Sequence, residues 1–249
     1  MDYSICITTF SERYNQLKKL ISEIRSFTNQ EILICVNGNY GVDFDEEYRR
    51  KVIELSLLHE KIYPIFFPEQ RGLAKLWNTL VIHSPNDWCL LLSEDVSIKT
   101  NSFFETLSSK LPDSPDLKII NGSFAHFVVH KKILYELGYF DERLLGFGHE
   151  DGDMIFRYIE KYDKWIEDYR INGIEHHNSD VIDKNIKLQL GCHKYSFFNK
   201  LFLFERESPK YVSDVNGVKS SFGYSAIRVL KEDNQYPYEQ FFLENKNML

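Results

Sequence analysis

Cysteine is scarce in this sequence, with four residues among 249, and no two of them form a Cys-x-x-Cys pair. Without such a pair there is no motif for structural zinc or dithiol redox chemistry. Cys6, Cys35 and Cys89 each lie inside a short apolar run, which is typical of a small thiol packed in a buried strand. We therefore expect structural cysteines and a reducing compartment.

Long hydrophobic runs and an excess of basic charge are also missing. No stretch approaches the roughly eighteen apolar residues of a membrane-spanning helix, and the opening MDYSICITTF is too short and too β-branched for a signal peptide. Lys and Arg number 30 against 37 Asp and Glu. Because binding to a nucleic acid backbone draws on clustered basic residues, we expect no nucleic acid partner. The lack of a signal peptide and of a long apolar run leads us to expect a cytoplasmic location.

What the sequence does contain is an alternation of strand-like and helix-like segments. Short β-rich runs alternate with segments whose apolar residues recur every three or four positions, such as Leu17, Leu20 and Ile24. Such alternation predicts an α/β fold with a mostly parallel central sheet covered by helices on both faces. The predicted strands are 3–9, 31–36, 62–67 and 88–92, and the predicted helices are 12–27, 45–59 and 72–83.

Polar residues follow each of these strands. In a parallel sheet the carboxyl ends of the strands meet at one edge, where ligands bind. We therefore expect one crevice lined by residues from four loops. They are Thr8, Thr9, Phe10, Ser11, Glu12 and Arg13, then Asn37 and Asn39, then Glu69, Gln70 and Arg71, and finally Ser93, Glu94 and Asp95.

Asp95 emerges from the buried run WCLLL beside Glu94. Hard carboxylate oxygens suit Mg²⁺ or Mn²⁺ bridging a diphosphate. His176 or His177 would complete such a site, since imidazole also binds Mn²⁺. The alternatives are that Asp95 caps a turn and that the histidines are ordinary loop or core residues.

Three carboxylates, Glu150, Asp151 and Asp153, follow the loop Gly146-Phe147-Gly148-His149 and open a helical pattern. Acids in the first turn of a helix are stabilised by free backbone N–H groups, which is the capping alternative. One acid suffices for that role, and three repel one another. The cluster favours a general base or a clamp for a substrate hydroxyl.

Further candidates lie near Gly72 and in the aromatic loop 139–149. Arg71 and Lys75 could contact phosphate, although a basic residue at a helix start is usually solvated. Aromatic residues such as Trp77 and Phe147 could stack on sugars, although such residues are core residues first.

The second half of the chain has a different pattern. A strand-like segment at 119–130 precedes a helix at 131–138, a helix begins at Glu150, and a last strand-like stretch ends in Glu175-His176-His177. Residues 186–249 are predicted to form a helical, aromatic extension to a main domain at 1–185, with halves 1–100 and 101–185. The aromatic run 194–204 is a candidate membrane contact or homodimer surface, or packs on the main domain.

The order of motifs over about residues 3–180 resembles the GT-A fold nucleotide-sugar glycosyltransferases, particularly glycosyltransferase family 2. SICITTFSER resembles the first nucleotide-binding element, and ILICVNGN has Asn37 where many members carry an Asp toward uracil. QRGLAKLWN is similar to the family's helix under the nucleotide, with Gly72 and Asn78 at the matching positions. LLLSEDV resembles the strand that ends in the DxD motif, with Ser93 replacing the first acid and Asp95 the last.

The acceptor half carries a more specific resemblance. ELGYFDERLLGFGHEDGDMIFR is similar to the family's Phe-Asp-Glu and Glu-Asp segment and to the acidic loop of the β-1,4-galactosyltransferases. The resemblance implies that Asp151 is the catalytic base and that His176 or His177 binds the metal. Glu150, one residue earlier, is the competing catalytic candidate and is better placed to hydrogen-bond an acceptor hydroxyl or orient the loop. The resemblance also implies an acceptor site formed by Phe147, Gly148, His149 and Asp153.

These resemblances imply an inverting, Mn²⁺- or Mg²⁺-dependent glycosyltransferase with a UDP-sugar donor. The acceptor would be a glycan or lipid-linked glycan of bacterial surface polysaccharide or lipopolysaccharide, at the inner face of the membrane. Two alternatives stay open. A nucleotidyltransferase usually has a glycine-rich loop where this chain has TTFSER, and a noncatalytic glycan-binding module would tolerate the missing acid at Ser93.

Overall fold

A seven-stranded sheet forms the centre of the fold, in the order β3-β2-β1-β4-β7-β6-β8. The first four of these strands are parallel, β7 is antiparallel to both of its neighbours, and β8 is parallel to β6. The computed structural model describes residues 2–10, 13–38, 43–142, 150–177, 211–212 and 219–220. The strands of the sheet are β1 (Tyr3–Phe10), β2 (Ile32–Asn37), β3 (Ile62–Phe66), β4 (Trp88–Ser93), β6 (Leu117–Ile120), β7 (Ser123–His130) and β8 (Glu167–Tyr169).

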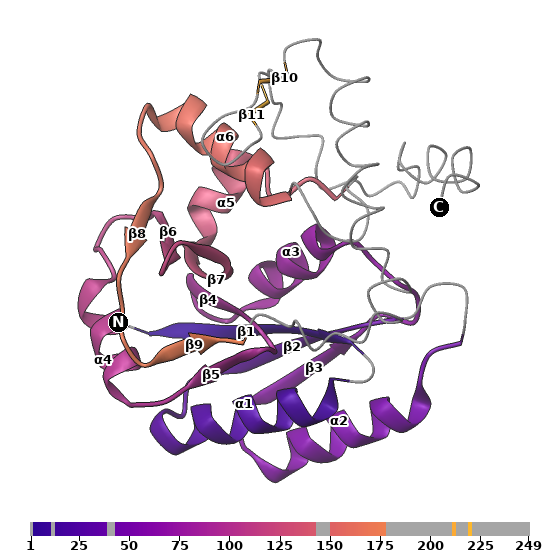
Figure 1. Cartoon of the computed structure of the whole chain (residues 1–249). Helices are drawn as coiled ribbons and strands as arrows, with labels where there is room; N and C mark the ends of the chain where they lie inside the picture. The colour runs from indigo at the N-terminus through magenta and orange to yellow at the C-terminus, as the bar shows by residue number, and fades with distance from the viewer. Residues whose placement is uncertain are drawn as a thin grey trace. The chain divides into compact units, whose positions relative to one another are not determined.

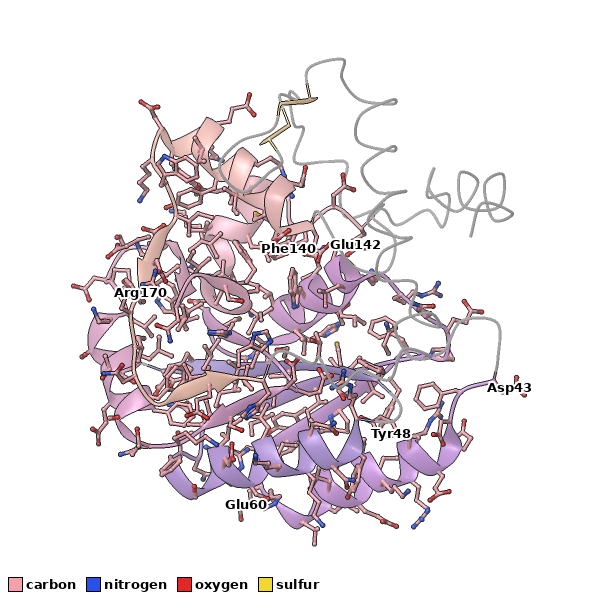
Figure 2. All side chains as sticks on the ribbon, in the orientation of Figure 1. Asp43, Tyr48, Glu60, Phe140, Glu142 and Arg170 are labelled. Atoms are coloured by element: carbon pink, nitrogen blue, oxygen red, sulfur yellow. The ribbon has the colours of Figure 1, made fainter. Side chains whose placement is uncertain are left out.

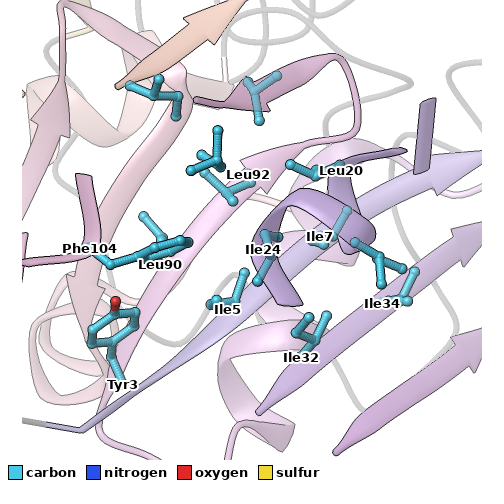
Figure 3. Close-up of a cluster of buried hydrophobic side chains, with 14 of the residues drawn as sticks. Tyr3, Ile5, Ile7, Leu20, Ile24, Ile32, Ile34, Leu90, Leu92 and Phe104 are labelled. Carbon is cyan, nitrogen blue, oxygen red and sulfur yellow. The ribbon is translucent and has the colours of Figure 1, made fainter. Parts of the chain in front are cut away.

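One face of this sheet packs against helices α1 (Tyr14–Phe27) and α2 (Glu46–Leu58), which Figure 1 shows side by side. The spacing of the buried residues Leu17, Leu20 and Ile24 turns one stripe of α1 toward the strands. These residues meet side chains of β1, β2 and β4 in a fully buried cluster (Figure 3). Helix α4 (Ser102–Lys110) and a small antiparallel sheet of β5 (Val96–Ile98) and β9 (Ile174–His176) contribute to the same core.

The chain divides into two compact units. The first comprises Met1–Gln70, Thr79–Ile133 and Glu167–Val181, and the second comprises Arg71–Asn78, Leu134–Ile166 and Ile182–Leu249. The remaining elements are α3 (Leu73–His83), α5 (Lys131–Leu137), α6 (Glu150–Tyr162), β10 (Tyr211–Val212) and β11 (Lys219–Ser220). Two of the boundaries between the units fall inside helices, after Asn78 of α3 and after Ile133 of α5.

The structure confirms the α/β class and the mostly parallel sheet. It corrects the strand-like segment 119–130, which is two strands joined at Asn121 and Gly122, where φ is 52° and 75°. An Asn-Gly pair with positive φ at both positions is a hairpin turn signal. The short elements β5, α4 and β8 are absent from the sequence prediction, because segments of three to nine residues show little periodicity.

The predicted extension 186–249 lies largely outside the described residues. Its four described residues pair as the antiparallel strands β10 and β11, which differs from the predicted helix at those positions. The predicted boundary at residue 185 and the aromatic run 194–204 lie outside the described residues. No helix in the described part of the chain is long and apolar enough to cross a membrane.

Candidate active site

The carboxyl ends of β1, β2, β3 and β4 lie at one edge of the sheet, as their parallel pairing requires. Thr8 and Thr9 are buried there, and the Thr9 hydroxyl lies 2.8 Å from the phenol oxygen of Tyr48. Tyr48, labelled in Figure 2, belongs to α2, so Thr9 connects the end of β1 to that helix. Glu12 and Asn39 lie outside the described residues.

Asp95 stands directly beyond this edge, in the turn between β4 and β5. The Ser93 hydroxyl donates a hydrogen bond of 2.5 Å to Oδ1 of Asp95, and Nε2 of His176 lies 3.3 Å from the same oxygen. Burial raises the pKa of Asp95, but the hydrogen bonds from His176 and Ser93 and the positive charge of His176 outweigh it and hold that pKa below its usual value. The Asp95 side chain is therefore a carboxylate at neutral pH.

His176 has the complementary shift. Its hydrogen bond to Asp95 raises the pKa of the imidazole, against the opposing effect of burial. The position of His176 follows from the small sheet, in which it pairs with Val96, the residue after Asp95. Strand pairing therefore brings together two side chains that are far apart in the sequence.

His177 has a different partner. Its Nε2 atom lies 2.6 Å from the Ser97 hydroxyl, and its backbone N–H donates to the carbonyl oxygen of Asp95 at 2.9 Å. The sequence left both histidines open as partners of Asp95. The structure places only the His176 ring against that carboxylate, while His177 connects β5 to the end of β9.

Glu94 is buried beside Arg13, whose Nε lies 3.7 Å from Oε1 of Glu94. Burial and the neighbouring charge of Asp95 raise the pKa of Glu94 to about 7, although Arg13 opposes the shift. Arg13 also packs over the Phe10 ring, 5.2 Å from its centroid. The sequence analysis expected Glu94 to contact a donor, and the structure places its carboxylate in a buried position beside the Arg13 guanidinium.

The loops after β2 and β3 pack closely at Gly38. A Cβ atom at this position would lie 2.5 Å from the backbone carbonyl carbon of Glu69, which is too close for any side chain. The sequence prediction included Asn37 and Asn39 but not the glycine between them. Its only signal was the Asn-Gly pair, which marks a turn without indicating what approaches it.

Within the second unit, the three acids of α6 have different settings. Asp153 is buried and accepts hydrogen bonds from Nε and Nη2 of Arg157 at 2.9 and 2.6 Å. Glu150 is buried, whereas Asp151 is half-buried and accepts a hydrogen bond from the backbone N–H of Gly152. Asp153, predicted to bind an acceptor, is thus engaged by Arg157. The other predicted acceptor residues, Phe147, Gly148 and His149, lie outside the described residues.

Asn78, another candidate from the sequence, forms hydrogen bonds within the protein. Its amide donates to the Phe140 carbonyl and to Glu142, and accepts from the Phe140 N–H, each at 2.9 Å. Figure 2 labels Phe140 and Glu142, and Lys75 forms an ion pair with Glu142 at 3.0 Å. Asn78, which the sequence analysis expected near the donor, therefore holds the segment after Tyr139 to α3. Gly72 is buried, and Arg71 is half-buried.

The residues around Asp95 supply some of the ligands that a divalent cation requires. Among the described residues, no group of three or more His, Cys, Asp or Glu side chains is arranged to hold a metal ion. Asp95 and His176 supply one carboxylate and one imidazole, both acceptable to Mn²⁺. They fit a cation whose other ligands are oxygens of a bound diphosphate and water, as Mg²⁺ and Mn²⁺ commonly have.

Neither a protein-family profile nor a curated protein sequence matches the chain. Solved structures do match it, and the class that they define is the GT-A fold of the glycosyltransferases. This similarity confirms the fold that the sequence motifs predicted.

Three of these structures illustrate the match. GalNAc-T7, solved with UDP, GalNAc and Mn²⁺, has a TM-score of 0.59 at 10% identity, over 71% of this chain and 44% of that chain. Glucosyl-3-phosphoglycerate synthase from Mycobacterium tuberculosis, solved with Mn²⁺ and UDP, has a TM-score of 0.53 at 12% identity, over 82% and 79%. The mannosyltransferase PcManGT from Pyrobaculum calidifontis has a TM-score of 0.51 at 11% identity, over 62% and 52%. The chain thus spans about half the length of two of these neighbours.

Proposed function

We propose that this protein is a glycosyltransferase that transfers a sugar from a nucleotide diphosphate donor to a hydroxyl group of a glycan acceptor. The observation that carries the proposal is the Asp95–His176 pair, which lies beyond the carboxyl end of β4 in a GT-A fold. A carboxylate and an imidazole at the ligand-binding edge of such a sheet suit a cation bound to a diphosphate.

UDP is the proposed nucleotide. Two of the three neighbours described above were solved with UDP and Mn²⁺, and the third with GDP-mannose and Mn²⁺. In this chain, Asn37 at the end of β2 and the loop after β3 are the proposed contacts of the nucleotide base. Arg71 and Lys75 are the proposed contacts of the phosphates.

Asp95 and His176 would hold Mn²⁺ or Mg²⁺, with Ser93 orienting the carboxylate through its hydrogen bond. When bound, the cation would neutralise the negative charge that develops on the departing diphosphate. The Ser93 hydroxyl keeps Asp95 Oδ1 in a fixed position, which limits the reorganisation needed when a donor binds.

Asp151 is the proposed general base. It is half-buried, whereas Glu150 and Asp153 are buried, so its carboxylate is the most accessible of the three to an acceptor hydroxyl. Removal of the hydroxyl proton by Asp151 would make the oxygen a better nucleophile. A single displacement at the anomeric carbon inverts its configuration. The proposed acceptor is a glycan or lipid-linked glycan of a bacterial surface polysaccharide or lipopolysaccharide.

A thermal-shift screen tests the proposal. Purified protein is heated with UDP, GDP, UDP-sugars or nucleoside triphosphates, each in Mn²⁺ and in EDTA. A ligand at a hundred times its dissociation constant stabilises the fold by about 2.7 kcal/mol. We expect stabilisation by UDP and UDP-sugars that requires Mn²⁺, followed by UDP release when an acceptor is added. Stabilisation by triphosphates with pyrophosphate release would instead indicate a nucleotidyltransferase, and binding without release of any nucleotide a noncatalytic module.

A further inference from the structure

His126 is a buried polar residue that the sequence analysis did not single out. It lies in β7 directly opposite Leu92 of β4. Leu92 is followed by Ser93, where β4 ends, and then by the turn that contains Asp95. Only 3% of His126 is exposed, and its strand neighbours on the same face, Phe124 and Val128, are buried and apolar. An imidazole therefore occupies a position where the pattern of β7 calls for an apolar side chain.

One polar atom of His126 has no partner that would explain its burial. Its Nδ1 atom is buried without a hydrogen-bond partner among the described residues. An unpaired buried polar atom costs about 1–3 kcal/mol. A residue that breaks a local pattern at such a cost is expected at a functional site more often than elsewhere.

The His126 ring lies near the imidazole of His176. The two ring centroids are 5.8 Å apart and the ring planes are inclined by 59°. This separation lies within the usual range for paired aromatic rings, about 4.5–7 Å. The ring of His126 thus supports the imidazole that lies against Asp95.

His176 needs such support. It is the last residue of β9, a strand of three residues, and its 3.3 Å contact with Asp95 is longer than an ideal hydrogen bond. His177, by contrast, has a 2.6 Å contact with Ser97 as well as its backbone bond to Asp95. Residues behind a ligand commonly set its orientation, and their loss weakens metal binding by about 10- to 100-fold.

We propose that His126 is a positioning residue, whose ring holds the His176 imidazole in place for a divalent cation shared with Asp95. This inference rests on the proposed function, because it concerns the same cation site. It adds that the affinity of the site depends on a residue in the central sheet that touches neither the cation nor the donor.

The test compares Mn²⁺ binding, measured by electron paramagnetic resonance of free Mn²⁺ with UDP present, across four variants of the full chain. His126→Leu fills the volume without a flat ring, and we expect about 10-fold weaker Mn²⁺ binding. His126→Phe retains a ring and should bind Mn²⁺ within about twofold of the wild type. His130→Ala is the control, because His130 lies in β7 as His126 does, but its ring packs on Trp88 at the start of β4, 5.1 Å between centroids, whereas Asp95 follows the end of β4. His176→Ala reports the loss of the ligand itself.

Each outcome decides the proposal. Weaker binding by His126→Leu with rescue by His126→Phe and no change in His130→Ala supports it. Unchanged binding by His126→Leu, equal weakening by Leu and Phe, or equal weakening by the His130 control overturns it. If His176→Ala weakens binding and His126→Leu does not, only the role of His126 fails. If the wild type binds no Mn²⁺, the cation site of the proposed function fails and the positioning role falls with it.

Discussion

Nε2 of His176 lies 3.3 Å from Oδ1 of Asp95, and this contact depends on the pairing of two very short strands. β5 follows Asp95 directly, and β9 ends at His176, so the pairing of Val96 with His176 brings the two side chains to the same place. The backbone N–H of His177 donates to the carbonyl oxygen of Asp95, which secures the same junction. The candidate cation site is thus built by the small sheet as much as by the end of β4.

The first prediction concerns Asp95. Asp95→Ala should abolish the Mn²⁺-dependent stabilisation by UDP while leaving the fold intact, because the residue lies in the turn after β4 and outside the apolar body of the strand. Thermal shifts with UDP, in Mn²⁺ and in EDTA, measure both effects. Unchanged stabilisation by UDP together with a loss of about 1 kcal/mol of folding free energy would instead show that Asp95 only caps its turn.

The two neighbouring histidines should differ in their effects. His176→Ala removes the imidazole that lies against Asp95, so we expect a clear rise in the Mn²⁺ concentration needed for half-maximal stabilisation by UDP. His177→Ala removes the contact with Ser97 and should mainly lower the melting temperature. Equal effects of both changes on the Mn²⁺ requirement would contradict the assignment of His176 as the ligand.

Asp95 and the two histidines show how much of this site the sequence predicts. An apolar run followed by acids marks the end of a buried strand, and the structure confirms that β4 ends at Ser93. The sequence did not distinguish His176 from His177, because that choice depends on the register of β9 against β5. Pairings between strands of three residues leave almost no periodic signal in a sequence.

Buried polar residues show a second limit. Asn78 and Asp153 were expected to bind substrate, yet the structure pairs them with the Phe140 backbone and with Arg157. A polar residue that satisfies a buried partner and one that awaits a ligand look alike in a sequence. His126 is the opposite case, since one histidine within the run SFAHFVV gives no sign that it meets His176.

Asn78→Ala should therefore destabilise the protein. The change leaves the buried N–H and C=O groups of Phe140 without the partners that Asn78 provides, and we expect a loss of roughly 2–4 kcal/mol in the free energy of unfolding. Urea denaturation measures this loss. Asn101→Ala is the control, because Asn101 is the exposed residue before α4, its side chain pairs with Glu105 and makes no capping hydrogen bond, and its loss should cost less than about 1 kcal/mol. Comparable losses for the two variants would argue against a structural role for Asn78.

Glu94 should make the stability of the metal-free protein depend on pH. Its pKa is raised to about 7 in the folded state, so between its unfolded pKa and pH 7 the folded state binds more protons than the unfolded state. The contribution of Glu94 to stability is therefore complete below its unfolded pKa, and it is lost as the pH rises from that value through about 7. Glu94→Gln removes this dependence, and its stability relative to the wild type should rise by at most about 2–3 kcal/mol between pH 5 and 8.

Urea denaturation of both proteins in EDTA, at pH 5 and at pH 8, measures that difference. Glu54→Gln is the matched control, because the Glu54 side chain is exposed beside Arg50. Its stability relative to the wild type should change little over the same range. A Glu94→Gln variant whose relative stability does not rise with pH would show that Arg13 keeps the Glu94 carboxylate ionised throughout.

The last prediction assigns the base. Asp151→Asn keeps the shape of the side chain but removes its ability to accept a proton, so sugar transfer should fall by about 10²–10⁴-fold while donor binding stays near normal. Glu150 is the comparison, because it lies one residue earlier and points about 100° away on the helix. It is buried, and we expect Glu150→Gln to raise the KM for the acceptor more than it lowers kcat. Steady-state assays of UDP release separate the two effects. A nearly active Asp151→Asn variant beside an inactive Glu150→Gln variant would reverse the two roles, since the proton would then have to pass to the buried carboxylate at the start of α6.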